Sequence, residues 1–342
     1  MSRSHDMVSA VDRLYRALYR SVLARLPERV SIAFGQWSLR HLPLDRLALF
    51  RNDDPRLAIT LGGVRLPNPL ILSSMYYDVA ILRRAMGLGW GAVTAKSITP
   101  GPRPGHPEPN LVRIQTVEGP GLVNCNGFKN PGLEAYRAAL VGLPHRVPLI
   151  VAAAGESAED YVRVVAGLQE FGDLVEINIS SPNTKLVYGW STRPHELKDV
   201  FRAVRAATAK PVIVKISPDF RDTNEEITIP AALDAGITIV NYGNTRRVEE
   251  PRLSQGVGGL SGPALFATTL ENVRRVRERF GGRLELIATG GIDSPEKARE
   301  ALAAGATACG IFTGFITRGP LLARRILDTL AAGGDTLAAG RP

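Results

Sequence analysis

Polar residues follow several apolar, β-branched runs in this sequence of 342 residues. Residues 178–185 read NISSPNTK, directly after the apolar run LVEI at 174–177. Asparagine side chains both donate and accept hydrogen bonds, so several on one face would suit a ring with amide and carbonyl edges, such as a pyrimidine. Four asparagines are candidates for this role: Asn124, Asn178, Asn183 and Asn244. Any one of them alone is more typical of a turn.

Two lysines lie inside apolar runs, Lys96 in VTAKS and Lys215 in VIVKIS. Lysine is rarely buried without a partner, although a lysine at a strand end can extend its ammonium group to water. The alternative, which we favour, is a fixed cation beside an electron-rich ring or a carboxylate. A flavin needs such a cation because it stabilises the reduced, anionic form.

Glycine-rich turns follow the last two apolar runs, in ATGGIDS (288–294) and IFTGF (311–315). Glycine lets backbone N–H groups approach a phosphate at a helix N-terminus, a recurrent site in (β/α)8 barrels. The candidates are Gly290, Gly291, Thr313 and Gly314. The stretch GVGGLSG (256–262) resembles a dinucleotide-binding motif, but it does not follow a strand in a βαβ unit, so we reject that interpretation.

The scaffold that must position these residues is predicted by eight short runs that alternate with helical patterns. The runs are PLILSS (69–74), GAVTAKS (91–97), LIVAAA (149–154), LVEINIS (174–180), PVIVKIS (211–217), ITIVNYG (237–243), LELIATG (284–290) and ACGIFTG (308–314). Near-continuous apolar strands are typical of parallel sheets, and eight βα units over about 250 residues favour a closed (β/α)8 TIM barrel of the α/β class. A doubly wound sheet is the alternative, but its glycine-rich first turn is missing.

Function in such barrels lies at the carboxyl ends of the strands. That end would also carry Ser73, Ser74 and Ser97. We expect hairpins in the Gly/Pro-rich excursion at 100–133, and a helix start at Ser157, which is followed by acidic residues.

The N-terminal region predicts a helical extension of the barrel. One helix spans 7–26 and ends at Pro27, and a second amphipathic segment follows at 30–37. The apolar face of the first helix carries Val11, Leu14, Tyr15, Leu18, Val22 and Leu26. Such a basic pair of helices either packs on the barrel or lies on an anionic membrane, and two apolar faces would allow both. The expected domains are the extension (1–48), the barrel (55–333) and a flexible tail (334–342).

Composition disfavours several other classes of protein. The formal charge is +9, but aromatic residues make up only 6% and no stretch interleaves them with clustered basic residues, so we expect no nucleic-acid binding. No apolar run approaches the ~20 residues of a membrane-spanning helix, and we see no secretory signal. Two cysteines are too few for a disulfide scaffold and are typical of a reducing compartment. We expect no metal site.

Seven ordered stretches resemble the dihydroorotate dehydrogenases, FMN-dependent barrels of pyrimidine biosynthesis. They are SITPGPRPGHPEPNLVRI, EGPGLVNCNGFKNPG, EINISSPNT, VIVKISPD, GGLSG, ATGGID and IFTGF, and the similarity runs from about Leu61 to Leu330. The N-terminal helices resemble the extension of the quinone-dependent class, in which it shapes a quinone tunnel. The resemblance implies oxidation of dihydroorotate to orotate with FMN, with electrons passed to a quinone. It also implies a cytoplasmic monomer or homodimer, peripherally associated with the inner face of the cell membrane.

The resemblance further implies roles for matching positions. Ser181 stands where the family places its catalytic base, which takes a proton from C5 of dihydroorotate while a hydride leaves C6 for FMN. The implied substrate-binding residues are Asn124, Asn178, Asn183, Asn244 and Thr245. With the serines at the strand ends, the FMN-binding set is Ser73, Ser74, Lys96, Ser97, Asn178, Lys215, Gly262, Gly290, Gly291, Thr313 and Gly314. Cys125 is a weaker candidate for the base, since a buried cysteine more often only packs.

One stretch differs from the quinone-dependent pattern. After the first predicted strand the chain reads SSMYYD (73–78), where that class has two alanines and a glycine and then a leucine, an aspartate and a lysine. The lysine stands instead on the second strand as Lys96, as in the soluble class. Fumarate and NAD therefore stay alternatives to a quinone. Two further alternatives are an FMN oxidoreductase of another dihydropyrimidine and a non-catalytic barrel that binds FMN or another phosphorylated ligand.

Overall fold

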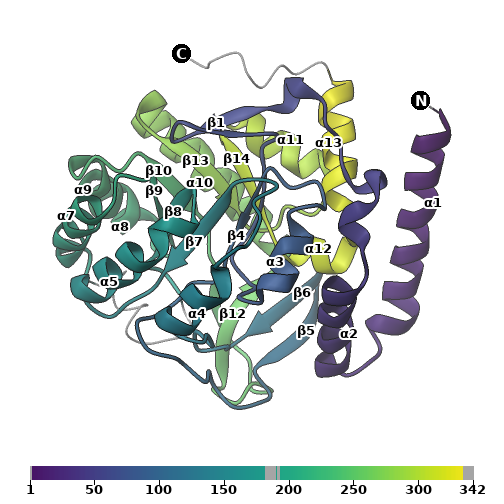
Figure 1. The fold of residues 1–342 in the computed structure, drawn as a ribbon, viewed down its shortest axis with the longest axis horizontal. Coiled ribbons are helices and arrows are strands. Elements are labelled where there is room, and N and C mark those ends of the chain that lie inside the picture. Colours follow the sequence, from purple (N-terminus) through teal and green to yellow (C-terminus); the bar gives the residue numbers. More distant parts are fainter. Residues whose placement is uncertain (1, 182–189, 191–192, 334–342) are drawn as a thin grey trace.

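The chain forms a closed parallel barrel surrounded by helices, with two N-terminal helices on its outside (Figure 1). The structure, a computed structural model, describes residues 2–181, 190 and 193–333. The barrel strands are β3 (Leu70–Leu72), β4 (Ala92–Thr94), β7 (Leu149–Ala153), β8 (Leu174–Asn178), β9 (Val212–Ile216), β10 (Ile239–Tyr242), β13 (Glu285–Thr289) and β14 (Ala308–Ile311). Each falls within one predicted run. The barrel prediction is therefore confirmed, and the doubly wound sheet is excluded.

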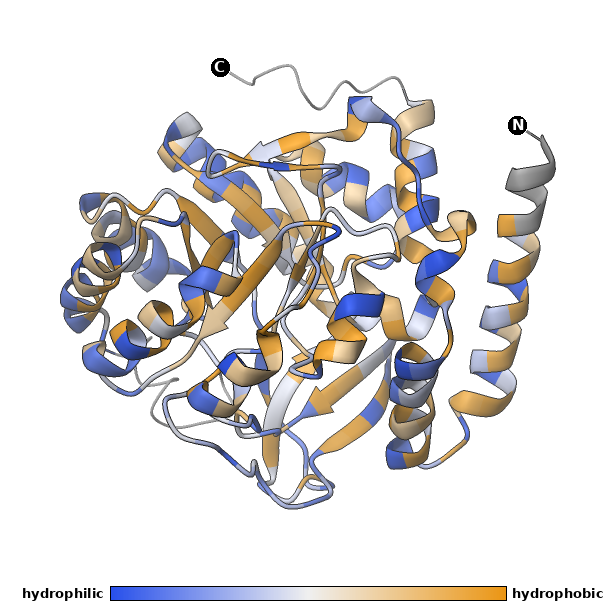
Figure 2. Ribbon diagram, viewed as in Figure 1, coloured by the Kyte–Doolittle hydropathy of each residue, from blue (hydrophilic) through white to orange (hydrophobic). Residues whose placement is uncertain are grey.

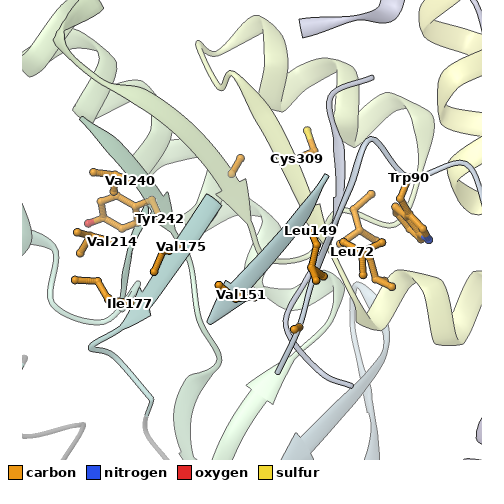
Figure 3. Close-up of a cluster of buried hydrophobic side chains, with 14 of the residues drawn as sticks. Leu72, Trp90, Leu149, Val151, Val175, Ile177, Val214, Val240, Tyr242 and Cys309 are labelled. Carbon is orange, nitrogen blue, oxygen red and sulfur yellow. The ribbon is translucent and has the colours of Figure 1, made fainter. Parts of the chain in front are cut away.

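The outward faces of the strands pack against a ring of helices. Val151, Val175 and Val214 are among the buried side chains of this layer (Figure 3). The helices are α3 (Val79–Ala85), α4 (Leu133–Leu140), α5 (Ala158–Leu168), α7 (Leu197–Ala207), α8 (Arg221–Thr223), α9 (Ile229–Asp234), α10 (Phe266–Phe280), α11 (Pro295–Ala303), α12 (Thr313–Arg318) and α13 (Leu322–Ala332). Ser157 caps α5, as predicted, by accepting a hydrogen bond from the Asp160 amide at 3.2 Å.

Inward-facing side chains fill the barrel, apolar at one end and polar at the other. The apolar end has one residue from each strand: Ile71, Ala92, Ile150, Leu174, Ile213, Ile239, Ile287 and Ala308. The hairpin of β1 (Ile59–Leu61) and β2 (Val64–Leu66) closes this end. Because strand side chains alternate in direction, the next inward side chain lies two residues further along each strand. These side chains are Ser73, Thr94, Ala152, Glu176, Lys215, Asn241, Thr289 and Gly310, so the barrel becomes polar towards its carboxyl end. They do not all lie at one height, because Glu176 is paired with Ile213 and Lys215 with Asn178.

A second, antiparallel sheet lies beside that end. Its order is β11 (Arg246–Glu249), β12 (Val257–Ser261), β6 (Gly119–Asn124) and β5 (Leu111–Thr116). The β5–β6 pair confirms the hairpin predicted in the excursion at 100–133. Because β12 pairs antiparallel with both neighbours, 256–262 is not a dinucleotide-binding turn. The sheet brings Asn124 and Gly262 to the barrel rim.

The N-terminal helices are α1 (Ser2–Leu18), which continues as a π-helical turn over 19–23, and α2 (Glu28–His41). The six apolar residues of the predicted first helix differ in burial, and the helical residues end at Leu23, before Leu26. Tyr15 faces the barrel and donates a hydrogen bond to the Ile316 carbonyl at 2.8 Å. Four of the others are exposed: Val11, Leu14, Leu18 and Val22.

Further polar contacts attach these helices to the barrel and its rim. Asp12 pairs with Arg325 of α13 at 3.1 Å, and Arg40 of α2 pairs with Asp78 at the start of α3. Arg113 of β5 donates a hydrogen bond to the Leu23 carbonyl at 2.6 Å. Within the described chain, no helix is both long and apolar enough to cross a membrane.

Candidate active site

A pocket opens between the carboxyl ends of the barrel strands and the antiparallel sheet. Its empty volume is about 1040 Å³, part of it open to solvent. Every described residue of the predicted site lines it: Ser73, Ser74, Lys96, Ser97, Asn124, Asn178, Ser181, Lys215, Asn244, Thr245, Gly262, Gly290, Gly291, Thr313 and Gly314. Asn183 lies outside the described residues. Segments that are distant in sequence thus converge on one cavity.

The end of β8 positions Ser181. The Asn178 side-chain oxygen accepts a hydrogen bond from the Ser180 amide at 3.3 Å, a local bond that turns the chain out of the strand. The Tyr161 hydroxyl holds the Asn178 carbonyl at 2.9 Å. Ser180 is fully buried, and its hydroxyl donates to the Lys215 carbonyl at 2.9 Å. Ser181, the next residue, reaches the pocket wall.

The asparagines are fixed by one another and by serines. Asn178 donates to the Ser97 hydroxyl at 3.2 Å, and Asn244 donates to the Asn178 side chain at 3.3 Å and to the Ser180 hydroxyl at 3.0 Å. Asn124, on the opposite wall, donates to the Gly259 carbonyl at 3.3 Å. These amides are held in place before a ligand arrives, which lowers the entropy that ordering them on binding would cost.

Lys96 is held on the wall next to β3. Its amide donates to the Tyr76 carbonyl at 2.9 Å, and its ammonium group lies 6.0 Å from the centroid of the Tyr77 ring. Burial, helped by the charge of Lys129, lowers the pKa of Lys96 to about 8. A negative group bound beside Lys96 would counteract this effect, because an opposite charge favours the protonated form.

The lowered pKa of Lys96 predicts how the affinity for an anionic ligand depends on pH. An anionic ligand needs Lys96 protonated, so above pH 8 binding must include uptake of a proton. We expect the affinity for FMN to be steady below pH 8 and to fall above it, by at most tenfold per pH unit. Fluorescence titrations of the FMN-depleted protein from pH 6.5 to 9.5 measure this. A Lys96→Met variant should bind more weakly at pH 7 and lack this pH dependence, and an identical fall in the variant would assign it to another group.

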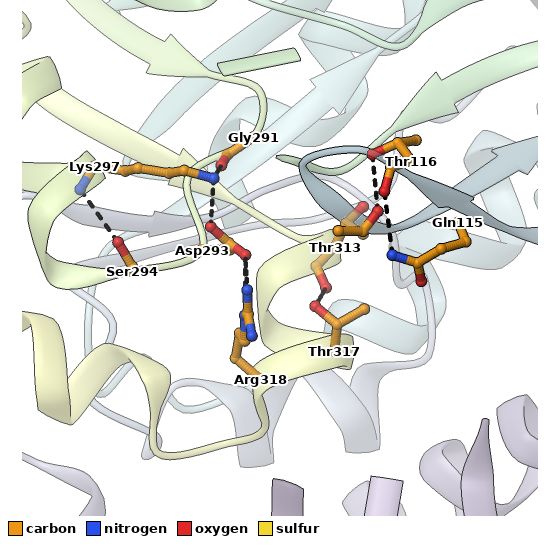
Figure 4. Close-up of polar contacts among 10 residues, drawn as sticks. Gln115, Thr116, Gly291, Asp293, Ser294, Lys297, Thr313, Thr317 and Arg318 are labelled. Carbon is orange, nitrogen blue, oxygen red and sulfur yellow. Dashed lines mark hydrogen bonds and ion pairs between the residues drawn. The ribbon is translucent and has the colours of Figure 1, made fainter. Parts of the chain in front are cut away.

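The far end of the pocket is lined by glycines of the last two strand-end turns, Gly290, Gly291 and Gly314; Figure 4 shows the polar contacts around Gly291 and Asp293. Gly291 has φ +76°, and a Cβ on it would lie 2.5 Å from the Phe266 amide nitrogen, so only glycine fits. Close by, Asp293 pairs with Lys297 at 2.8 Å and with Arg318 at 2.7 Å. Asp293 lines the pocket and neutralises both cations, so a phosphate here would be held by backbone N–H groups of the glycine turns.

Several lining residues were not in the predicted set, among them Met75, Asn126, Phe128, Ser261, Thr289 and Asp293. Asn126 stands in the NCN motif next to Asn124 and donates to its side chain at 3.2 Å, so the motif itself was the available signal. Glu176, which lies below the pocket, was also absent from the predicted set. It is an acidic residue within an apolar strand, the same signal that singled out Lys215. Cys125 is not among the described lining residues; it packs 3.7 Å from the Ser254 hydroxyl.

The fold and the pocket together define a class, the (β/α)8 barrels whose polar pocket at the strand ends suits a phosphorylated cofactor and a small polar substrate. A family model described as dihydroorotate dehydrogenase matches residues 56–333. The chain belongs to the dihydroorotate dehydrogenase family, as the sequence stretches had indicated.

Similar proteins agree with this assignment. The chain is 35% identical to a dihydroorotate dehydrogenase (quinone) of Sphingopyxis alaskensis, over 97% of this chain and 96% of the relative. It is 34% identical to a protein of the same name from Thermus thermophilus, over 91% and 94% of the two chains. Among solved structures, DHODH from Eimeria tenella in complex with ferulenol superposes with a TM-score of 0.79 at 25% identity, covering 92% of this chain and 94% of that one.

Proposed function

We propose that this protein oxidises dihydroorotate to orotate with bound FMN and passes the electrons to a quinone, as a step of pyrimidine biosynthesis. The observation that carries the proposal is the convergence of Ser181, Lys96 and Lys215 with the asparagines on one pocket, in a chain whose relatives are named dihydroorotate dehydrogenase (quinone). A pocket that only bound a phosphorylated ligand would have no need of a base.

The pocket fits FMN on observations of its own. Three lining hydroxyls, those of Ser73, Thr245 and Thr289, are buried and have no hydrogen-bond partner among the described residues. Buried polar groups are normally paired, so these are available to a polar ligand. The glycine turns would hold the phosphate, and Lys96, Lys215 and the serines would hold the flavin. When bound, FMN would accept a hydride from the substrate.

The protein side chains divide the remaining work between them. Asn124, Asn178, Asn244 and Thr245, with Asn183 of the segment outside the described residues, would hold the pyrimidine ring and its carboxylate. The Ser181 hydroxyl would take the C5 proton. Serine is a weak base near pH 7, so it needs a site with little water and a route for the proton. Ser181 is 7% exposed, which meets the first of these conditions.

Aromatic residues connect the pocket with the N-terminal helices and favour entry of a quinone from that side. Phe312 lines the pocket, and its ring stacks edge-on against Tyr76 at 5.8 Å between centroids. Burial, with smaller contributions from Tyr19 and Tyr76, raises the pKa of Tyr15 of α1. The Tyr15 ring stacks on Tyr19 at 6.4 Å between centroids. We therefore assign residues 1–48 to acceptor access and 55–333 to oxidation of the substrate.

The same helices are proposed to bind the inner face of the cell membrane. Their outer surface exposes Leu14, Leu18, Val22, Phe34 and Trp37, with exposed fractions up to 69% for Leu14 and 52% for Trp37. Hydrophobic positions are interspersed with hydrophilic ones along these helices (Figure 2). Basic residues beside an apolar face suit an anionic lipid surface.

The proposed function is tested by mixing the purified yellow protein anaerobically with dihydroorotate. We expect bleaching of the flavin, and then rapid recovery of the colour with a quinone but not with fumarate or NAD. Dihydrouracil serves as the control substrate and should leave the flavin oxidised. A colourless protein, or one bleached by neither compound, would contradict the proposal. Recovery of the flavin colour with fumarate or NAD but not with a quinone would contradict the proposal that a quinone is the electron acceptor.

A further inference from the structure

The polar part of the barrel interior contains charged groups whose partners are within the barrel itself. Glu176 of β8 is 1% exposed and Lys215 of β9 is 6% exposed. Their side chains approach to 3.8 Å between Oε1 and Nζ. Asn241 of β10 donates a hydrogen bond to Glu176 Oε2 at 2.7 Å. Three neighbouring strands thus support one carboxylate.

The register of the strands explains this arrangement. Lys215 is paired with Asn178 on one side and with Asn241 on the other. Glu176 lies two residues before Asn178 on the same inward face of β8, deeper in the barrel than the pocket. Lys215 lines the pocket, whereas Glu176 is not among the described lining residues. The carboxylate therefore lies behind the cation as seen from the pocket.

Glu176 and Lys215 attract each other but do not form a hydrogen bond with each other. At 3.8 Å the ammonium group is beyond ordinary hydrogen-bond distance from Glu176 Oε1, and this oxygen has no hydrogen-bond partner within the described chain. Glu176 thus compensates the buried charge of Lys215 through its field, while the N–H donors of Lys215 are not taken up by that carboxylate. A buried cation without such a partner would be strongly unfavourable.

We propose that Glu176 is a positioning residue for Lys215, which holds the ammonium group towards the pocket and offsets part of its positive field at the flavin. The inference rests on the proposed function only in that FMN occupies the pocket. Glu176 contacts no ligand in this scheme. It would set how strongly the bound flavin favours its reduced, anionic form, because a nearby negative charge disfavours a developing anion.

The test is the midpoint potential of bound FMN in a Glu176→Gln variant. Glutamine keeps the shape and the oxygen that accepts from Asn241, and removes only the charge. We expect the potential to rise by at least the equivalent of tenfold in the equilibrium constant for reduction, about 30 mV for a two-electron couple. A merely structural role would alter stability without raising the potential, and a potential equal to that of the wild type would overturn the proposal.

A matched control removes a carboxylate from the opposite end of the barrel. Glu285 begins β13 and accepts the Gly62 amide at 3.0 Å, so Glu285→Gln should leave the potential unchanged. An equal rise in both variants would overturn the proposal. Dithionite reduces the flavin without dihydroorotate, so a protein that binds FMN but is not reduced by dihydroorotate would contradict the proposed function and leave this measurement valid.

A second pair of variants keeps the proposal falsifiable if Glu176→Gln does not retain FMN. Lys215→Met leaves Glu176 buried without a counter-charge and should lower the midpoint of thermal unfolding. Glu176→Gln in the Lys215→Met background should recover most of that loss. Two independent, additive losses of stability would show that the residues are not coupled, and would overturn the proposal.

Discussion

Replacing Ser181 with alanine is expected to slow the reduction of bound FMN by dihydroorotate by about 100- to 10,000-fold, the usual contribution of a general base. The change removes the hydroxyl oxygen that would receive the C5 proton. It adds no bulk, and the FMN contacts proposed for the lysines and glycines stay in place. Anaerobic stopped-flow absorbance measures the rate, and the flavin spectrum of the purified variant shows whether FMN is retained.

Two controls make this experiment specific. Ser157→Ala removes a serine hydroxyl from the start of α5; it should cost about 1 kcal/mol of stability and leave the rate unchanged. Cys125→Ala tests the other candidate base, which packs outside the pocket, and should likewise leave the rate unchanged. Reduction of the Ser181→Ala variant at the wild-type rate would remove Ser181 from the mechanism. A large loss of the reduction rate in the Cys125→Ala variant would assign the role of catalytic base to Cys125.

The barrel was predictable because each strand is a short apolar run between turn residues. Such runs, repeated between helical patterns, are typical of buried parallel strands. The site was predictable for a related reason. Burying polar residues at the ends of apolar strands, such as Asn178 and Lys215, costs free energy unless they contact a partner or a ligand. In a parallel barrel the carboxyl ends of all strands lie at the same end, so such residues come together.

The partners of those residues were less accessible from the sequence. Glu176 neutralises Lys215 from the adjacent strand, but which strands adjoin and in what register follows from barrel closure. The partners of Asp293 illustrate the same point. Lys297 lies four residues later, on α11, whereas Arg318 lies on α12. Local patterns identify candidates, while pairing between them is a tertiary property.

The N-terminal helices show the limit of periodicity most clearly. The apolar residues of α1 give a single broad stripe in the sequence. Only the packed structure separates Tyr15, which bonds to Ile316 on the barrel, from Leu14, which is exposed. The sequence therefore left barrel packing and membrane contact as alternatives, whereas in the structure one part of the stripe contacts the barrel and another part is exposed.

Deletion of residues 1–41 is expected to abolish turnover with a membrane quinone while dihydroorotate still reduces the flavin. The lining residues lie between Ser73 and Gly314, so the pocket keeps its walls. The deletion removes Tyr15 and Tyr19, which continue the aromatic path from Phe312 and Tyr76, and exposes that path to water. The cut falls at the end of α2 because Asp45, 1% exposed, pairs with Arg84 at 2.6 Å and must be kept.

The shortened protein should also lose its affinity for vesicles that contain anionic lipid, which a flotation assay measures. A Phe34→Gln/Trp37→Gln double variant separates the two effects, since both side chains are exposed on α2. Burying one such apolar side chain contributes about 1.5–3 kcal/mol, so vesicle binding should weaken roughly 100-fold or more, while turnover with a short-chain, water-soluble quinone should persist. Full turnover with a membrane quinone in the shortened protein would show that the acceptor reaches the flavin by another route. Unchanged flotation of the double variant would place the membrane contact elsewhere on the protein.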